Sequence, residues 1–304
     1  MTSKELRILQ CNLNKRRETT DSILNSDTAQ FDILAVQEQH YAPLLKSSLL
    51  HQSWTLIEST TQPEFPPPRS AIYINNNLLP TSAFRQVHLP INDVTAIEII
   101  PDIPQNKPTL LMNIYNPGDN PIITPLRQYL QRHLHIQDYD KILILGDFNL
   151  HHPTWNPIAY TKHDALSEEL LELMEDHDLR LLLPPGTITY PCNTAAGGTT
   201  IDLVFGNEKA EECMLKCQIS ADNDHGSDHL PIETILDLFT RPLPPTEPAY
   251  NYEKTKWKLL ETKLKEYLPE TIDPDCTTPT QLDQFSTNLT NAIKQAIDET
   301  TPRK

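Results

Sequence analysis

The stretch KILILGDFNLHHPTWN, residues 141–156, decides how the rest of the chain is interpreted. Its first five residues, 141–145, are apolar and rich in β-branched side chains, and Gly146 ends the run, which is typical of a buried strand. Asp147 and Asn149 follow, so an acid and an amide stand at the C-terminal end of that strand. Open α/β sheets carry their ligand sites at such strand ends. Asp and Asn are also ordinary turn residues, so the pattern alone is equally consistent with an Asx-turn.

Polar side chains follow other predicted strands as well. A strand predicted over residues 6–11 leads to Asn12. A second, over residues 31–36, leads to Glu38, and a third ends in Tyr115. Glu38 and Tyr115 have ordinary alternatives, because a strand end often carries a surface carboxylate or an amphipathic tyrosine at the rim of the core.

Asp202 lies inside an apolar run, residues 201–205, where an unpaired carboxylate is costly. It therefore needs a partner, and His229, just ahead of a strand predicted over residues 230–238, is a candidate. Such an acid would fix the tautomer of the imidazole and raise its pKa, so that the ring stays cationic near pH 7. A lone histidine is otherwise more often structural.

Strands alternating with helices and hairpin-like connections predict a mixed α/β sandwich over residues 5–240. The proline-rich segment RPLPPTEP opens a linker over residues 241–250, and residues 251–304 predict a helical tail. Within residues 5–240, amphipathic helices are predicted at residues 124–135 and 165–178. Further strands are predicted at residues 54–58, 71–75, 95–100, 109–115 and 187–190.

The composition excludes several classes of protein. No apolar run approaches the roughly 18 residues of a membrane span, and the N-terminus lacks the layout of a signal peptide. The five cysteines are scattered, without the spacing of a disulfide framework or a zinc site. We therefore expect an intracellular protein with free thiols and no membrane partner, located in the nucleus if it acts on chromosomal DNA.

The net charge of -16 disfavours tight binding of nucleic acid, whose phosphates are also negative. Residues 241–304 hold nine Lys and Arg and ten Asp and Glu, so the rest of the chain carries -15. Part of that excess could be a carboxylate cluster for a divalent cation, and the remainder favours weak binding or help from another module. The best candidates for phosphate contacts are Lys15, Arg16, Arg17 and Arg69, with a solvated charge run as the alternative.

Together these residues resemble the endonuclease/exonuclease/phosphatase superfamily. Phosphodiester hydrolysis needs an activated water, a cation and donors around the phosphorus. The resemblance covers about residues 5–238 and implies a four-layer α/β fold, a two-sheet β-sandwich flanked by helices. The matching pieces are Asn12, Val36-Gln37-Glu38, Tyr115, Gly146-Asp147-Phe148-Asn149, Ile201-Asp202 and Ser227-Asp228-His229.

Within that superfamily, the segments 149–155 (NLHHPTW) and 227–232 (SDHLPI) resemble the endonuclease domain of non-LTR retrotransposons. Residues 250–257 (YNYEKTKW) resemble the connector between that endonuclease and its reverse transcriptase. The chain holds no Tyr-x-Asp-Asp polymerase motif. We therefore expect a truncated or solitary element endonuclease, with DNA as its partner and any reverse transcriptase supplied separately.

The resemblance implies a role for each matching residue. Glu38 binds Mg²⁺, with Mn²⁺ as an alternative, Asn12 helps to orient the ion and the water, and Asp228 assists the metal. Asp147 takes the proton from the attacking water, and Asn149 holds the phosphate.

The same resemblance supplies the remaining contacts. Tyr115 and His229 donate hydrogen bonds to the phosphate as negative charge develops, and Asp202 holds His229. Thr189 and Thr199 lie where relatives touch the DNA backbone.

Three alternatives stay open at this point. His151 and His152 could be metal ligands, although a structural or DNA-flanking role is favoured because their counterpart is typical of the retrotransposon branch. A small-molecule phosphatase of the same superfamily is disfavoured, since that branch has an arginine shortly after GDxN, where this chain has two histidines. A catalytically inactive interaction module is disfavoured by the intact set of acids, amides and histidine. The expected function is a Mg²⁺-dependent endonuclease that nicks one DNA strand and leaves a 3′-hydroxyl.

Overall fold

The computed structural model describes residues 5–44, 47–59, 67–101, 106–133, 135–238, 250–268 and 279–303. The chain divides into two compact units, Met1–Phe239 and Thr240–Lys304. Residues 241–249 lie outside the described residues, so the predicted proline-rich linker stays a prediction. Leu134, near the end of the helix predicted at residues 124–135, also lies outside them.

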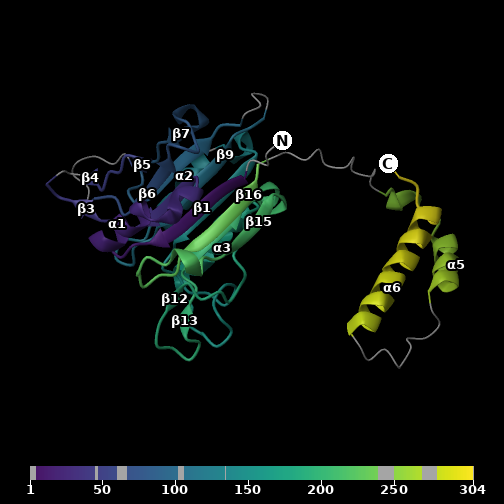
Figure 1. Ribbon diagram of the computed structural model, residues 1–304. Helices are drawn as coiled ribbons and strands as arrows, with labels where there is room; N and C mark the ends of the chain where they lie inside the picture. The colour runs from purple at the N-terminus through teal and green to yellow at the C-terminus, as the bar shows by residue number, and fades with distance from the viewer. Residues whose placement is uncertain are drawn as a thin grey trace. The chain divides into compact units, whose positions relative to one another are not determined.

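The first unit is built mainly of strands (Figure 1). These are β1 (Glu5–Asn12), β2 (Ile33–Gln37), β3 (Tyr41–Ala42), β4 (Ser47–Ser48), β5 (Trp54–Glu58), β6 (Ser70–Asn75), β7 (Phe84–Val87), β8 (Val94–Ile99), β9 (Thr109–Tyr115), β10 (Lys141–Asp147), β11 (Arg180–Leu181), β12 (Tyr190–Pro191), β13 (Gly198–Thr199), β14 (Asp202–Gly206), β15 (Met214–Ile219) and β16 (Ile232–Asp237). The helices are α1 (Arg17–Asn25), α2 (Ile123–His133), α3 (Ala165–Asp176) and α4 (Glu208–Glu212), with short 3₁₀ turns η1 (Asp27–Gln30), η2 (Thr81–Ala83), η3 (Ile136–Asp138) and η4 (Ala221–Asn223).

The strands form two mixed sheets. Among the described residues, one six-stranded sheet has the order β15-β16-β1-β2-β6-β5 and the other β11-β14-β10-β9-β8-β7. In each sheet the central pair, β1 with β2 and β9 with β10, is parallel, and the flanking pairs are antiparallel. The hairpin of β12 and β13 extends past the ends of the sheets (Figure 1).

Strand β10 shows why the central strands read as unbroken apolar runs. Successive side chains point to opposite faces of a sheet. Leu143 and Leu145 pack into the core between the two sheets, while Ile142 and Ile144 pack into a second core with α2 and α3. A strand covered on both faces needs apolar residues at every position.

The other sheet is covered in the same way. On β1, Leu6 and Ile8 face the core between the sheets, whereas Leu9 packs with Ile23 and Leu24 of α1. The order of layers is therefore helix, sheet, sheet, helices. The predicted fold class, a two-sheet α/β sandwich flanked by helices, is confirmed.

Gly146 is required by the close approach of β9. Its φ is 143°, and a Cβ built there would lie 1.9 Å from the carbonyl oxygen of Ile114. No rotation of a side chain could relieve a backbone clash of that size, so only glycine fits. The glycine thus lets β10 run against β9 up to Asp147, where the candidate site begins.

The second unit consists of η5 (Tyr252–Lys254), α5 (Trp257–Tyr267) and α6 (Pro279–Thr300). Tyr267 bonds to Glu299 at 2.9 Å, and the amide of Lys256 donates to the carbonyl of Thr300 at 3.0 Å. These bonds hold α5 against α6 as a helical hairpin. None of the described helices of either unit combines the length and apolarity needed to cross a membrane.

Candidate active site

Strand register brings the predicted residues to one end of the sandwich. Parallel strands end on the same edge of a sheet, and β9 and β10 are aligned so that Tyr115 pairs with Asp147. Antiparallel β14 begins on that edge, with Asp202 opposite Asp147. In the other sheet, Asn12 ends β1, and Glu38 follows β2. Strand pairing within each sheet, and the packing of one sheet on the other, thereby collect residues that are far apart in the sequence.

Asp147 is buried at the junction of the two sheets, with 1% of its surface exposed. Asn12, on the opposite sheet, donates from Nδ2 to Asp147 Oδ2 at 2.8 Å. The backbone amide of Asn149 donates to Oδ1 at 3.0 Å, and its side-chain amide donates to Oδ2 at 3.2 Å. Three donors therefore fix the orientation of this carboxylate.

Burial raises the pKa of Asp147 to about 7, and repulsion from Asp202 adds to the effect. The charge of His229 and the amides of Asn12 and Asn149 lower it in part. A general base works best when its pKa lies near the working pH. The environment of Asp147 gives it that property.

His229 is held by Asp202. The Nδ1 atom of His229 lies 2.9 Å from Asp202 Oδ2 and 3.1 Å from Oδ1, and both residues are buried. Nδ1 donates to the acid, so a proton on Nε2 is free for another acceptor. Burial disfavours the charged ring, but Asp202, and more weakly Asp147 and Asp228, outweigh it and raise the pKa of His229 from 6.5 to about 9.

Thr189 supports this pair rather than lying on the surface. Its hydroxyl accepts hydrogen bonds from the amides of Ile201 and Asp202, both at 3.1 Å, and its carbonyl accepts from the amide of Leu230 at 2.8 Å. Thr189 thus holds the segments that carry both the acid and the histidine. Thr199 is buried as well, so neither hydroxyl faces solvent, and their predicted contacts with the DNA backbone stay predictions.

A second group lies around Tyr115. Burial, followed by the charge of the neighbouring Glu38, raises the pKa of Tyr115. The guanidinium of Arg69 stacks 4.9 Å from the centre of the Tyr115 ring. Arg69 is itself held by the buried Asp93 at 2.8 Å, with a second bond from its backbone amide at 2.9 Å. Arg69, predicted as a DNA contact, therefore also orients Tyr115.

Asp93 was missed in the sequence. The only signal was an acid directly before the apolar strand β8, a position that is usually a solvated strand end. Ser227 was singled out only as part of a motif, yet its hydroxyl donates to the carbonyl of Asn12 at 2.6 Å and so ties the histidine loop to β1.

The predicted basic cluster lies beside the site and is exposed. Lys15 Nζ is 2.8 Å from Glu38 Oε1, Arg16 donates to the carbonyl of Gly226 at 3.4 Å, and Arg17 pairs with Asp21 at 3.5 Å. Asp228, next to His229, is also exposed.

Left-handed backbone marks the same loops. Asn14, Lys15, Glu38 and Asn149 have φ values of 51°, 57°, 48° and 48°. Residues other than glycine adopt this conformation at a cost, and they cluster at functional sites.

The residues around Glu38 fit a hard divalent cation. The Glu38 carboxylate and the Asn12 carbonyl oxygen are the ligand types that Mg²⁺ prefers. Asn12 Oδ1 accepts one hydrogen bond, from the amide of Asn14 at 2.8 Å, which leaves a second lone pair for a metal. The ammonium of Lys15 on Glu38 shows that this carboxylate accepts a cation.

The group Asp147, Asp202 and His229 also brings its ligand atoms within 4.8 Å of one another. Both oxygens of Asp202 face the Nδ1 of His229, however, so that acid is already satisfied by a cationic partner. Glu38 is also paired with a cation, but Lys15 is exposed and can move away, whereas His229 is buried against Asp202, so the residues around Glu38 fit a metal ion better.

The fold and the residues gathered at this end of the sandwich resemble those of the endonuclease/exonuclease/phosphatase superfamily. Residues 109–233 match the family model described as "Endonuclease-reverse transcriptase". No curated protein matches the chain.

Solved structures resemble about three quarters of the chain at low sequence identity. The endonuclease domain of TRAS1, a telomere-specific non-LTR retrotransposon, matches with a TM-score of 0.59 and 18% identity over 77% of this chain and 99% of that one. The AP endonuclease LMAP from Leishmania major has a TM-score of 0.59 and 14% identity, over 77% and 88%. The catalytic domain of Xenopus laevis APE2 has a TM-score of 0.54 and 17% identity, over 76% and 92%. The predicted resemblance to the superfamily, and to its retrotransposon branch, is confirmed.

The charges of the site predict how stability depends on pH in the metal-free protein. The folded-state pKa of His229 lies above its unfolded value, so its contribution is complete below pH 6.5 and is lost as the pH rises through about 9. A shift of this size corresponds to roughly 3 kcal/mol. Asp147, whose pKa is also raised, changes stability in the same direction at lower pH, between 3.8 and about 7. In EDTA, the thermal midpoint should therefore fall between pH 6.5 and pH 9.

Calorimetry or circular dichroism of the wild type and of His229→Asn measures this effect. Asparagine keeps a neutral donor near the Nδ1 position but does not titrate. Its stability should change less over the same interval. Equal pH dependence in the two proteins would show that His229 does not gain a proton on folding.

Proposed function

We propose that the chain is a divalent-metal-dependent DNA endonuclease that hydrolyses phosphodiester bonds and nicks one strand in the manner expected of a retrotransposon endonuclease. The observation that carries the proposal is one cluster that pairs a buried carboxylate of raised pKa with a cationic histidine. Asp147 and His229 lie close enough for their ligand atoms to share a 4.8 Å group with Asp202. A base and a cationic donor so close together suit attack of water on a phosphate.

Asp147 is assigned as the general base. Its carboxylate accepts the proton of the attacking water, and the donors from Asn12 and Asn149 keep the two oxygens in place while it does so. These donors also stabilise the charged form of the acid, so it is available as a base at neutral pH. Asn149 is additionally assigned to hold a phosphate oxygen, for which its side-chain amide would exchange one of its hydrogen bonds to Asn116 and Asp147.

His229 and Tyr115 are assigned as donors to the phosphate. His229 keeps its Nε2 proton because Asp202 stabilises the charged ring. Tyr115 keeps its phenolic proton because its pKa is raised. Both groups can therefore donate to oxygens on which negative charge develops, and neither has to change protonation to do so.

Glu38 and Asn12 would hold a Mg²⁺ ion, with Asp228 nearby as an assisting acid and Mn²⁺ as an alternative ion. When bound, the ion supplies positive charge that offsets the charge on the phosphate oxygens. Lys15 would have to leave Glu38 as the ion binds.

Binding of DNA is assigned to the exposed basic loop of Lys15, Arg16 and Arg17. The strongly acidic chain allows only weak, salt-sensitive binding. A reverse transcriptase supplied separately is the proposed partner that would extend the 3′-hydroxyl.

Incubation with supercoiled plasmid, with Mg²⁺ or with EDTA, tests the proposal. Mg²⁺-dependent conversion to nicked circles supports it, and extension of the nick by an added reverse transcriptase would show the 3′-hydroxyl. Release of phosphate from inositol phosphates without nicking would assign the chain to the phosphatases. Inactivity on both substrates would leave an interaction module.

Removing Lys15 should change the metal requirement. Lys15 competes with a cation for Glu38, so the Mg²⁺ concentration for half-maximal nicking should fall about two- to fivefold in Lys15→Ala, the size of an exposed ion pair. The affinity for DNA should fall at the same time, because one phosphate contact is lost. Titration of nicking against Mg²⁺ and of binding against salt separates the two effects.

Arg17→Ala is the matched control, since Arg17 belongs to the same loop but pairs with Asp21. It should weaken DNA binding without altering the Mg²⁺ requirement. An unchanged Mg²⁺ requirement in Lys15→Ala would show that the ammonium does not compete for the metal ligand.

A further inference from the structure

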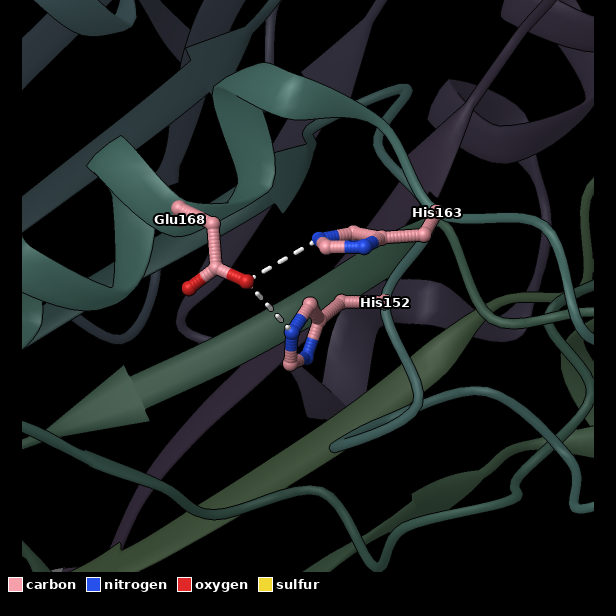
Figure 2. A group of neighbouring side chains, drawn as sticks. All are labelled: His152, His163 and Glu168. Atoms are coloured by element: carbon pink, nitrogen blue, oxygen red, sulfur yellow. Dashed lines mark hydrogen bonds and ion pairs between the residues drawn. The ribbon is translucent and has the colours of Figure 1, made fainter.

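His152, His163 and Glu168 gather outside the candidate active site (Figure 2). His152 lies in the loop after β10, His163 precedes α3, and Glu168 stands in the first turn of that helix. Figure 2 shows both imidazole rings directed at the same carboxylate oxygen. His152 Nε2 and His163 Nε2 lie 3.3 Å and 3.0 Å from Glu168 Oε1.

We propose that these three side chains form a second metal site, for a transition-metal ion of the Zn²⁺ class. Bonds of 2.0–2.2 Å from zinc to histidine nitrogen and carboxylate oxygen place tetrahedral ligands about 3.3–3.5 Å apart. The distances from Glu168 Oε1 to the two Nε2 atoms, 3.3 Å and 3.0 Å, lie near this range. The three ligand atoms lie within 4.8 Å of one another. Two imidazoles with one carboxylate favour Zn²⁺ over Mg²⁺, which prefers oxygen.

The backbone prepares the two histidines to face each other. The amide of His151 donates to the side chain of Asp164 at 2.8 Å, and the amide of Asp164 donates to the carbonyl of His151 at 3.0 Å. His151 directly precedes His152 in the sequence, and Asp164 directly follows His163. This reciprocal pair of hydrogen bonds therefore brings the two loop segments that carry the histidines together. The rings are consequently 4.8 Å apart, with planes at 76°.

The loop between them is anchored as well. Trp155 is fully buried, and its indole donates to the carbonyl of Leu150 at 3.1 Å. The ring of His152 lies 5.1 Å from that indole, so its position is limited by packing. Ligands on a fixed scaffold lose little freedom when a metal binds.

One contact opposes the metal. The amide of Thr154 donates to His152 Nδ1 at 3.1 Å, which places the ring proton on Nε2 in the metal-free form. Metal binding at Nε2 moves that proton to Nδ1 and breaks the hydrogen bond. Since one such bond is worth up to about a factor of ten, the site should bind less tightly than closed structural zinc sites.

A metal bound at this site would cross-link two segments of the chain. It would tie the loop that follows the acid-amide motif to the start of α3, through ligands that the proposed nuclease chemistry does not use. Three protein ligands leave a fourth position for water, as in open zinc sites. The inference is independent of the proposed nuclease activity.

The experiment is a calorimetric titration of the metal-stripped full chain with Zn²⁺, in millimolar Mg²⁺ near neutral pH. The wild type should bind one equivalent. His163→Ala and Glu168→Ala should weaken binding by at least about 100-fold, because removing a direct ligand exceeds the 10- to 100-fold loss for outer partners. Both side chains are exposed, so the variants are expected to fold.

His135→Ala and Glu175→Ala are matched controls, exposed residues outside the cluster, and should bind as the wild type does. Asp147→Asn should also retain the equivalent of Zn²⁺, which separates this site from the active-site cluster. Co²⁺ should give the visible spectrum of a four-coordinate ion in the wild type and lose it in His163→Ala. No zinc binding, unchanged binding in His163→Ala, or binding that disappears in Asp147→Asn would each overturn the proposal and leave a hydrogen-bonded cluster.

Discussion

Nicking by Asp147→Asn should be about 10²- to 10⁴-fold slower than nicking by the wild type. The substitution keeps the size of the side chain but removes the group proposed to accept the water proton. Asn12 and Asn149 direct three N–H donors at the carboxylate, and an amide nitrogen cannot accept from them. The measurement is the single-turnover rate of plasmid nicking at saturating Mg²⁺.

The fold should survive this change. The buried Asp147 carboxylate is disfavoured by burial and by repulsion from Asp202, so the neutral amide offsets part of the lost hydrogen bonding. The thermal midpoint in EDTA should accordingly stay within a few degrees of the wild type. Asp178→Asn is the matched control, because Asp178 is exposed and has a left-handed backbone that asparagine tolerates. A loss below tenfold in Asp147→Asn would remove Asp147 from the role of general base.

The fold could be predicted from the sequence where strands are covered on both faces. Such strands read as unbroken apolar runs: β9 has its predicted bounds, and β10 begins at its predicted residue and continues through Gly146 to Asp147. Prediction failed where pairing, not composition, makes a strand. Residues 187–190 were predicted as a strand, but only Tyr190 is in one, β12, because Thr189 turns its hydroxyl inward to hold Asp202. The edge strand β15, with its half-polar sequence, was missed.

The members of the candidate site could be found because each stands at a strand end, where polar residues after an apolar run are conspicuous. Their partners could not. Asp93, just before β8, contacts Arg69, just before β6 of the other sheet, and Thr189 contacts Asp202 from a separate loop. No spacing of residues in the sequence indicates either contact. The grouping of His152 with His163 and Glu168 was missed for the same reason, since two of the three ligands lie beyond the motif that drew attention to the first.

His229→Ala should lower the rate of nicking by about 10²- to 10³-fold, the cost of one donor to a developing negative charge. Asp202 acts through His229, so Asp202→Asn should cost less, and adding it to His229→Ala should cost almost nothing more. The pH dependence tests the same arrangement. Activity needs the protonated ring, so the wild type should lose activity as the pH rises through about 9. In Asp202→Asn that loss should begin at lower pH, because the charge that raised the pKa of His229 is gone.

Rates of the two single variants and the double variant, each measured across pH, decide between a donor and a structural histidine. A structural role would lower activity equally at every pH, and the effects of the two substitutions would add. Thermal unfolding of each variant in EDTA separates loss of fold from loss of chemistry. If the alkaline limit of Asp202→Asn coincides with that of the wild type, the ion pair does not set the protonation of the catalytic imidazole, and the proposed role of the cationic ring fails.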